Sequence, residues 1–319
     1  RQVINYEPKQ MILLDQWESG LYDLHNDLIA NDLAKNVEVV IGSVYDNSRM
    51  RNVFETLKPS IVFHAAAYKH VPLMEDNPSE SIKTNVLGTK TIVDLAHEYN
   101  VEKMVIISTD KAVNPTNVMG ASKRIAEIYA QKKNESSDTQ YVTTRFGNVL
   151  GSNGSVIPLF RRQIEQGGPL TVTDENVTRY FMTIPEACQL VLEAGAMGDG
   201  GEIFVFDMGK PIKIIDLAKK MIRLSGLEVD KDIEIKISGL RPGEKLYEEL
   251  LADKENALPT HHNQILRARN CPCPEGVIDE IEKLIVLFES QNNEAIVKQM
   301  KHIVPEFVSN NSKYPKLDK

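Results

Sequence analysis

The chain has 319 residues, of which 42% are hydrophobic and 26% charged, and its formal net charge is −8. This length can bury a full core, as one large α/β domain or as two lobes. The acidic balance argues against a general nucleic-acid-binding protein, which needs a basic surface, but it allows a local basic pocket. With no signal peptide and no apolar run of about 18 residues, we expect no membrane span in this chain.

Cysteine and histidine spacing gives no sign of a metal site. Of the three cysteines, Cys271 and Cys273 are separated only by Pro272, and no second pair matches them. His261 and His262 lie in a polar stretch without spaced partners. We therefore expect no metal, reduced thiols and a cytoplasmic location.

The N-terminal segment has only part of a dinucleotide-binding pattern. Residues 1–8 predict a helix that ends at Pro8, and residues 10–14 (QMILL) predict a strand followed by Asp15. An acid at the end of the second strand of such a unit binds the adenosine ribose. The first strand and its Gly-rich phosphate turn are missing, because the sequence contains no G-x-G-x-x-G. We interpret the chain as truncated at its N-terminus.

Helical and strand patterns alternate along the next hundred residues. Three small residues, Ala65, Ala66 and Ala67, follow a predicted strand and would let a cofactor approach the backbone. His64 before them is interpreted as a packed structural histidine. The elements expected here are helices over 21–35, 48–57 and 83–99 and strands over 37–41 and 61–63.

The most informative stretch is residues 108–123, STDKAVNPTNVMGASK. The apolar run 101–108 predicts a buried strand, so Thr109, Asp110 and Lys111 come where that strand ends. Open parallel sheets bind ligands at this edge, and an acid, a base and a hydroxyl together suggest proton transfer. Turn residues with a surface salt bridge would explain the three side chains equally well.

The second half of the chain continues the alternation, which predicts an α/β fold with a doubly wound parallel sheet. Two segments stand out: the glycine-rich loop RFGNVLGS (145–152) and GLRPGEKLYEE (239–249). A helix N-terminus with a charged first turn would also explain the latter. We expect residues 309–319 to be frayed. The remaining expected elements are strands over 140–144, 170–173, 202–208 and 233–237 and helices over 156–166, 184–196, 214–225, 277–289 and 293–303.

These motifs in this order resemble the extended short-chain dehydrogenase/reductases. The segments AAxKHVP (66–72), R-x-G-N-V-x-G-S (145–152), TRYFM (178–182) and GLRPGEKLYEE (239–249) are similar to those of the nucleotide-sugar 4,6-dehydratases. Relatives usually carry Tyr-x-x-x-Lys after the acid–base triplet, whereas Met119 stands here at the Tyr position and Lys123 is retained. This variant resembles the large, membrane-anchored UDP-N-acetylglucosamine 4,6-dehydratases of bacterial capsule and O-antigen pathways. The resemblance covers residues 1–266.

The resemblance implies a cycle in which NAD oxidises C4 of a UDP-N-acetylhexosamine, water leaves across C5 and C6, and the sugar becomes a 4-keto-6-deoxy sugar. It implies that Thr109 orients the C4 hydroxyl, Asp110 is the acid for water loss, and Lys111 is the C5 base. Since Met119 cannot ionise, Asp110 or a water takes the first proton, and Lys123 binds the nicotinamide ribose. A lysine base needs a lowered pKa, which burial could provide.

The resemblance also implies two sets of binding residues and a division of the chain. We expect residues 1–147 to form an incomplete NAD-binding Rossmann domain, to which 178–208 return, and 148–319 to form mainly a UDP-sugar lobe and C-terminal helices. The cofactor-binding residues would be Asp15, Asp46, Ala65, Ala66, Ala67, Lys69, Asn85, Ser108 and Lys123. The substrate-binding residues would be Lys69, Asn148, Ser155, Thr171, Arg179, Arg241 and Glu244.

Three other interpretations stay open. An epimerase of the same family would share the oxidation at C4 but have no use for an Asp–Lys elimination pair. A catalytically silent fragment could bind a UDP-sugar or a partner subunit without the phosphate turn. A structural role in a membrane-bound complex, at the cytoplasmic face of the inner membrane, is the third. In each case the resemblance implies a homo-oligomer.

Overall fold

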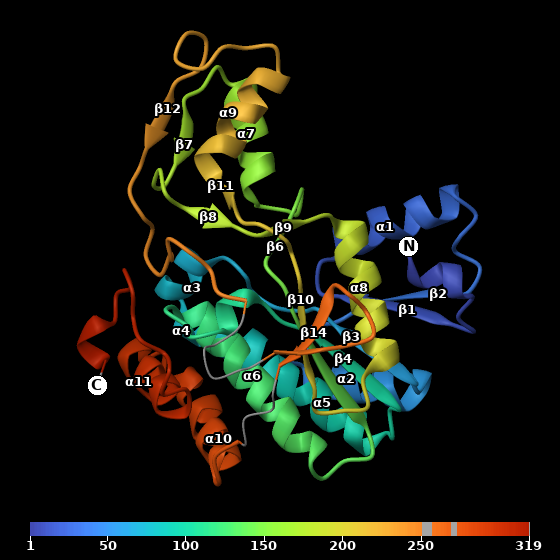
Figure 1. Cartoon of the computed structure of the whole chain (residues 1–319). Coiled ribbons are helices and arrows are strands. Elements are labelled where there is room, and N and C mark those ends of the chain that lie inside the picture. The colour runs from blue at the N-terminus through green and yellow to red at the C-terminus, as the bar shows by residue number, and fades with distance from the viewer. Residues whose placement is uncertain (251–256, 269–272, 319) are drawn as a thin grey trace.

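The computed structural model describes residues 1–250, 257–268 and 273–318 and has an α/β architecture with a central sheet and a smaller lobe (Figure 1). The sheet has the order β13-β14-β10-β5-β4-β3. Strands β3, β4, β5 and β10 are parallel to one another. At one end of the sheet, β14 is antiparallel to β10 and β13 is antiparallel to β14. Its strands are β3 (Ile61–His64), β4 (Lys103–Ile107), β5 (Gln140–Arg145), β10 (Ile203–Phe206), β13 (Ala257–Pro259) and β14 (Ile265–Ala268).

A separate parallel pair precedes this sheet. Strand β1 (Met11–Asp15) pairs with β2 (Val37–Ile41), and neither pairs with β3. Ile61 and Phe63 of β3 are 51% and 41% exposed. In the Rossmann strand order, the first strand of the sheet lies between the two strands that correspond to β1 and β3.

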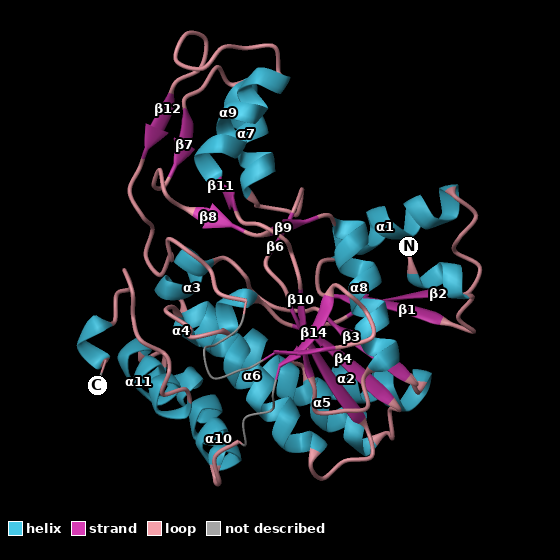
Figure 2. Cartoon of the chain, in the orientation of Figure 1, coloured by secondary structure: helices cyan, strands magenta, loops and turns pink. Residues whose placement is uncertain are grey.

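Helices cover both faces of the sheet (Figure 2). The chain places α5 (Gly88–Glu98) and α6 (Val118–Asn134) on one face and α8 (Ile184–Met197) on the other. The other helices of this part are α1 (Glu18–Ala30), α2 (Asn47–Leu57), α3 (Val71–Asp76), α4 (Pro78–Ser81), the π-helix η2 (Ile82–Leu87), and the 3-10 turns η1 (Val3–Tyr6) and η3 (Asp110–Ala112).

Most predicted elements are confirmed, with three differences in the first hundred residues. Residues 1–8 contain only the short turn η1, so the predicted helix there is wrong in extent. The helix predicted over 21–35 begins earlier and ends at Ala30. The helix predicted over 83–99 opens with the π-helical η2, a form often found at functional sites.

The smaller lobe has its own apolar core around Phe160, Leu170, Val172 and Ile222. Helices α7 and α9 pack there against short strands (Figure 1). The short pair β6 and β9 joins the lobe to the large sheet. The lobe elements are α7 (Val156–Glu165), β7 (Leu170–Val172), β8 (Thr178–Arg179), β11 (Ile212–Lys213), α9 (Ile214–Leu224) and β12 (Ile235–Ile237), with β6 (Asn148–Val149) and β9 (Phe181–Met182) at the junction.

The C-terminal helices α10 (Val277–Leu287) and α11 (Asn293–Ile303) belong by packing to the first core. Ile281 and Val297 are fully buried in the same cluster as residues of α5 and α6. The predicted frayed terminus is wrong for residues 309–318, because Tyr314 is buried and donates a hydrogen bond to the carbonyl of Glu75. Two short turns complete this region: η4 (Phe288–Ser290) and η5 (Pro315–Leu317). Of the helices the structure describes, none has the length and apolarity to cross a bilayer.

A buried ion pair fastens α6 to the sheet. Glu127 of α6 accepts from Arg145 Nε at 2.9 Å and from Arg145 Nη2 at 2.7 Å. The Ser108 hydroxyl donates to the same carboxylate at 2.6 Å. Arg145 and Glu127 are 1% and 0% exposed, and the guanidinium lowers the pKa of Glu127 to about 2 despite its burial.

We expect Glu127→Gln to destabilise the fold by about 3–5 kcal/mol, because it removes the charge of one partner of a buried ion pair. Folding lowers the pKa of Glu127 from 4.5 to about 2. The pair therefore contributes fully above the unfolded-state pKa and loses its contribution as the pH falls through this window. Urea unfolding followed by circular dichroism should show that the free energy of unfolding falls more steeply with decreasing pH in the wild type than in the variant. Glu135→Gln, at the exposed end of the same helix, is the control, and equal losses for both variants would contradict the assignment.

Candidate functional site

The Thr109–Asp110–Lys111 triplet forms the short turn η3 at the carboxyl end of β4. Thr109 Oγ1 and Lys111 Nζ each donate to Asp110 Oδ1 at 2.9 Å. The Asp110 side chain is 0% exposed and that of Lys111 is 17% exposed. Asp110 Oδ2 is buried, and no described residue forms a hydrogen bond with it. The sequence prediction that these three groups lie together at a strand end is confirmed.

Helix α6 packs directly on this turn. Its N-cap Asn117 accepts from the Gly120 amide at 2.8 Å. A Cβ added at Gly120 would lie 2.1 Å from the Lys111 carbonyl oxygen, so only glycine permits this approach. One turn of helix then brings Met119 and Lys123 to the same buried face, each 4% exposed.

The pKa values of the two buried lysines, Lys111 and Lys123, are shifted in opposite directions. Burial lowers the pKa of Lys123 to about 8, and the charge of Glu127 offsets this only in part. Burial also disfavours the charged form of Lys111, but the carboxylates of Asp110 and Glu248 outweigh it and raise the pKa of that amine. We expected burial to lower the pKa of Lys111, as a base requires. That expectation is wrong, because the pKa of Lys111 is raised.

Residues from distant segments complete the surroundings of Lys111. Asn148 Oδ1 accepts from its ammonium at 3.4 Å, and Glu248 Oε1 lies 3.4 Å from the same nitrogen. Residues 239–250 run as turns and not as a helix, so the alternative of a helix N-terminus there is wrong. Glu248 was not among the site residues predicted from the sequence, because its only sequence signal was its place in the GLRPGEKLYEE segment.

Arg179 anchors that segment. Its Nη1 donates to the carbonyls of Thr178 and Leu246, and its Nη2 donates to the carbonyl of Lys245 and to Glu244 Oε1. The side chain is 7% exposed. A phosphate contact by Arg179 would require some of these partners to exchange, so that role stays a prediction.

The other predicted substrate residues lie nearer the surface. Arg241 is 58% exposed and its Nε lies 3.2 Å from Glu244 Oε2. Glu244 Oε1 also accepts from Thr173 at 3.1 Å. Thr171 lies on the exposed side of β7, where its hydroxyl accepts from Gln163 at 2.8 Å. None of these contacts by itself identifies a nucleotide.

A cationic cluster lies beside the start of α7. A Cβ added at Gly154 would meet the His70 ring at 2.6 Å, so His70 packs against the residue before the N-cap Ser155. Burial lowers the pKa of His70, and the charges of Lys69 and Arg241 lower it further. Ser155 Oγ is buried, makes no cap hydrogen bond and has no partner in the described part of the chain. Lysine, arginine and a free helix N-terminus together favour an anion.

The residues predicted to bind a cofactor line the carboxyl ends of β1 to β4. Asp15 and Asp46 are exposed, and their carboxylates accept from the Trp17 and Arg49 amides. Ala65 and Ala66 are exposed after β3.

Two of the predicted cofactor residues and the packed histidine make internal contacts. Asn85 is 0% exposed and exchanges two hydrogen bonds with the Tyr68 backbone, so it braces this loop as expected. The Ser108 hydroxyl donates its hydrogen bond to the Glu127 carboxylate. His64 is buried beside Thr89, and burial lowers its pKa to about 3, so it is a packed neutral histidine as predicted.

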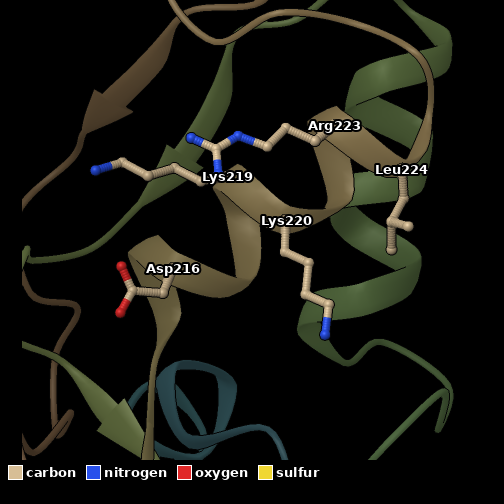
Figure 3. Close-up of a pocket in the computed structure, with 5 residues that line it drawn as sticks. All are labelled: Asp216, Lys219, Lys220, Arg223 and Leu224. Carbon is tan, nitrogen blue, oxygen red and sulfur yellow. The ribbon is translucent and has the colours of Figure 1, made fainter.

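A shallow depression elsewhere shares no residue with this site. It lies on the outer surface of α9 and is lined by Asp216, Lys219, Lys220, Arg223 and Leu224 (Figure 3). Among the described residues, no group of three His, Cys, Asp or Glu side chains could hold a metal ion. Cys188 is exposed, Cys273 Sγ lies 4.0 Å from the Ile128 carbonyl oxygen, and Cys271 lies outside the described residues.

Sequence comparison relates this chain to enzymes of surface polysaccharide synthesis. A family described as polysaccharide biosynthesis protein matches residues 1–270. A capsular polysaccharide biosynthesis protein, CapD of Staphylococcus aureus, is 57% identical over 80% of this chain and 43% of its own length. A UDP-N-acetylglucosamine 4,6-dehydratase (inverting) of Campylobacter jejuni is 34% identical over 80% of this chain and 73% of its own. A UDP-glucose 4-epimerase of Rickettsia rickettsii is 44% identical over 61% and 57%.

Solved structures agree on the fold. Pen from Bacillus thuringiensis has a TM-score of 0.77 at 34% identity and covers 83% of this chain and 82% of its own. DesIV of Streptomyces venezuelae, a dTDP-glucose 4,6-dehydratase solved with NAD, has a TM-score of 0.66 at 21% identity, with coverage of 76% and 79%. The predicted Rossmann-type α/β fold is confirmed. The chain spans less than half the length of CapD.

We expect one lysine of the folded chain to titrate near pH 8, because burial lowers the pKa of Lys123 to about that value. Lysine-selective ¹³Cε NMR between pH 6 and 10 measures it. Lys123→Met should remove this signal, and Lys133→Met, at the end of the same helix, should leave it in place. A titration that survives Lys123→Met would contradict the assignment.

Proposed function

The chain belongs to the polysaccharide biosynthesis protein family, whose relatives here include nucleotide-sugar dehydratases and epimerases, and on that premise we propose that it carries out NAD-dependent 4,6-dehydration of UDP-N-acetylglucosamine. The product would be a UDP-4-keto-6-deoxy-N-acetylhexosamine for surface polysaccharide. The observation that carries the proposal is the buried Asp110–Lys111 pair at the carboxyl end of β4. One carboxylate oxygen of Asp110 has no hydrogen-bond partner among the described residues, so it is available to exchange a proton with a bound substrate.

The residues present fit the nicotinamide half of NAD. Lys123 is buried on the face of α6 that borders the triplet, and Ala65 and Ala66 leave the carboxyl end of β3 open to close approach. Asp15 and Asp46 would hold the adenosine half at the ends of β1 and β2. When bound, NAD supplies the oxidant for C4 and later the reductant for C6. The Gly-rich turn that binds the diphosphate of the cofactor is not among the residues of this sequence.

Each residue of the triplet then has one task. Thr109 would hold the C4 hydroxyl, and the unpartnered oxygen of Asp110 would accept its proton, because Met119 cannot ionise. Asp110 would return this proton to the C6 hydroxyl as it leaves as water. Lys111, in its neutral form, would take the C5 proton and return it to C5 when hydride adds to C6, and Lys123 would bring positive charge to the nicotinamide ribose. Proton transfers of this kind contribute about 10²–10⁴-fold each.

A sugar epimerase is the second candidate, supported by the 44% identity to the Rickettsia protein. Epimerisation needs the oxidation at C4 but no elimination, so it gives no reason for burying Lys111 between two carboxylates. A chain that binds a UDP-sugar without turning it over is a further candidate, because the sequence contains no G-x-G-x-x-G turn. A homo-oligomer is part of the proposal as the resemblance implies it.

We expect incubation with UDP-N-acetylglucosamine and NAD⁺ to yield a product lighter by one water, measured by mass spectrometry. Asp110→Asn should slow this at least about 100-fold, because it removes the group that accepts and returns a proton. Asp216→Asn, an exposed acid on α9, is the control. An epimerised product of unchanged mass would refute dehydration, and normal turnover by Asp110→Asn would refute the acid assignment.

We also propose that the cationic cluster of Lys69, His70 and Arg241 at the start of α7 binds the UDP diphosphate. Lys69→Met should weaken UDP binding about tenfold in calorimetry, through loss of a charge-assisted hydrogen bond. Uridine, which has no phosphate, should bind the variant as it binds the wild type. Lys231→Met in the small lobe is the control, and an equal loss of UDP and uridine would contradict a phosphate contact.

A further inference from the structure

Glu248 is the buried carboxylate that the assignments above do not use. Its side chain is 3% exposed, with Oε1 at 3.4 Å from Lys111 Nζ and 3.8 Å from Arg179 Nε. Its other oxygen, Oε2, is buried and has no hydrogen-bond partner among the described residues. The next residue, Glu249, has a different environment, because its side chain is exposed and accepts a hydrogen bond from Asn114 at 2.8 Å.

Lys111 thus lies between two carboxylates that come from different parts of the chain. Asp110 belongs to the same turn, whereas Glu248 reaches Lys111 from the segment that follows the small lobe. The charged groups around Lys111 are Asp110, Glu248 and Arg179, and Glu244 pairs with Arg179 behind them. Asn148 adds a neutral acceptor.

A purely structural role explains this arrangement poorly. A buried carboxylate oxygen without a partner costs stability, so folds retain such groups only where something else requires them. Here the unpartnered oxygens of Asp110 and Glu248 belong to the two carboxylates that contact Lys111. If the segment 239–250 only needed an anchor, Glu244 and the backbone carbonyls bound to Arg179 already provide it.

We propose that Glu248 is a positioning residue that, together with Asp110, holds the Lys111 amine in place and stabilises the ammonium that forms when Lys111 accepts a proton. The inference rests on the proposed function, in which Lys111 accepts the C5 proton. Glu248 belongs to the same segment as Arg241 and Glu244, so this contact links that segment to the triplet. The raised pKa of Lys111 agrees with this role.

The test measures Lys111 without any turnover. At pH 9, acetic anhydride acetylates only neutral amines, and peptide mass spectrometry reports the rate at Lys111 relative to exposed lysines. An opposite charge within about 4–6 Å shifts a pKa by about one to three units, so Glu248→Gln should speed acetylation of Lys111 about tenfold or more. Glu249→Gln is the matched control and should leave the rate unchanged. Equal rates in Glu248→Gln and the wild type would overturn the proposal.

A second variant guards against misfolding. Glu248→Asp keeps the charge and shortens the side chain, so its rate should lie between those of the wild type and Glu248→Gln. Near-ultraviolet circular dichroism checks that each variant is folded. If Glu248→Asp is folded and acetylates as fast as Glu248→Gln, or faster, charge at this position does not control Lys111, and the proposal is wrong.

The pH profile of dehydration gives the independent functional readout. Because Lys111 accepts the C5 proton in its neutral form, the limb that reports its titration should move at least about one unit to lower pH in Glu248→Gln. An unmoved limb with a reduced rate would mean that Glu248 is only structural. If no dehydration occurs in the wild type, the proposed function fails, while the acetylation rates still decide the contact between Glu248 and Lys111.

Discussion

The buried pair of Glu127 and Arg145 is the constraint on which the site depends. It joins α6 to the end of β5, and the Ser108 hydroxyl adds the end of β4 to the same carboxylate. These three elements carry the triplet, the Met119–Lys123 face and Asn148. Since both charges are buried, displacing either partner breaks two charge-assisted hydrogen bonds between them. The pair therefore fixes the mutual geometry of the groups proposed to react.

The same pair explains why two lysines twelve positions apart differ so much. The charge of Glu127 is largely neutralised by Arg145 and Arg124, so it supports the Lys123 ammonium only weakly, and burial lowers the pKa of that lysine to about 8. Lys111 is also buried, but it lies against two carboxylates that raise its pKa. Burial alone therefore does not decide the charge of a lysine, and the fold gives each amine a different charge preference through its neighbours.

Sequence reasoning succeeded where the signal is local. Apolar runs and their polar ends predicted β4 and the place of Thr109–Lys111, and helical spacing predicted the shared face of Met119 and Lys123. It failed where contacts join distant segments. Glu248 and Glu249 are adjacent identical residues, and only the path of the segment after the small lobe makes one buried and the other exposed. The raised pKa of Lys111 depends on that same long-range contact.

The C-terminal residues show why the site cannot be divided at a domain boundary. Glu75, which is fully buried, accepts from the Val118 amide at the start of α6 and from the Lys313 amide and the Ser312 hydroxyl. Asn311 next to them binds the Arg241 carbonyl at 2.7 Å and accepts from the Gly243 amide at 2.8 Å. Residues 311–313 thus tie the helix that carries Lys123 to the segment that carries Glu248. Residues 311–313 therefore connect the segment 239–250 to α6, and α6 packs on the turn that carries Asp110 and Lys111. The turn and the segment that are proposed to form the site thus share one set of hydrogen bonds.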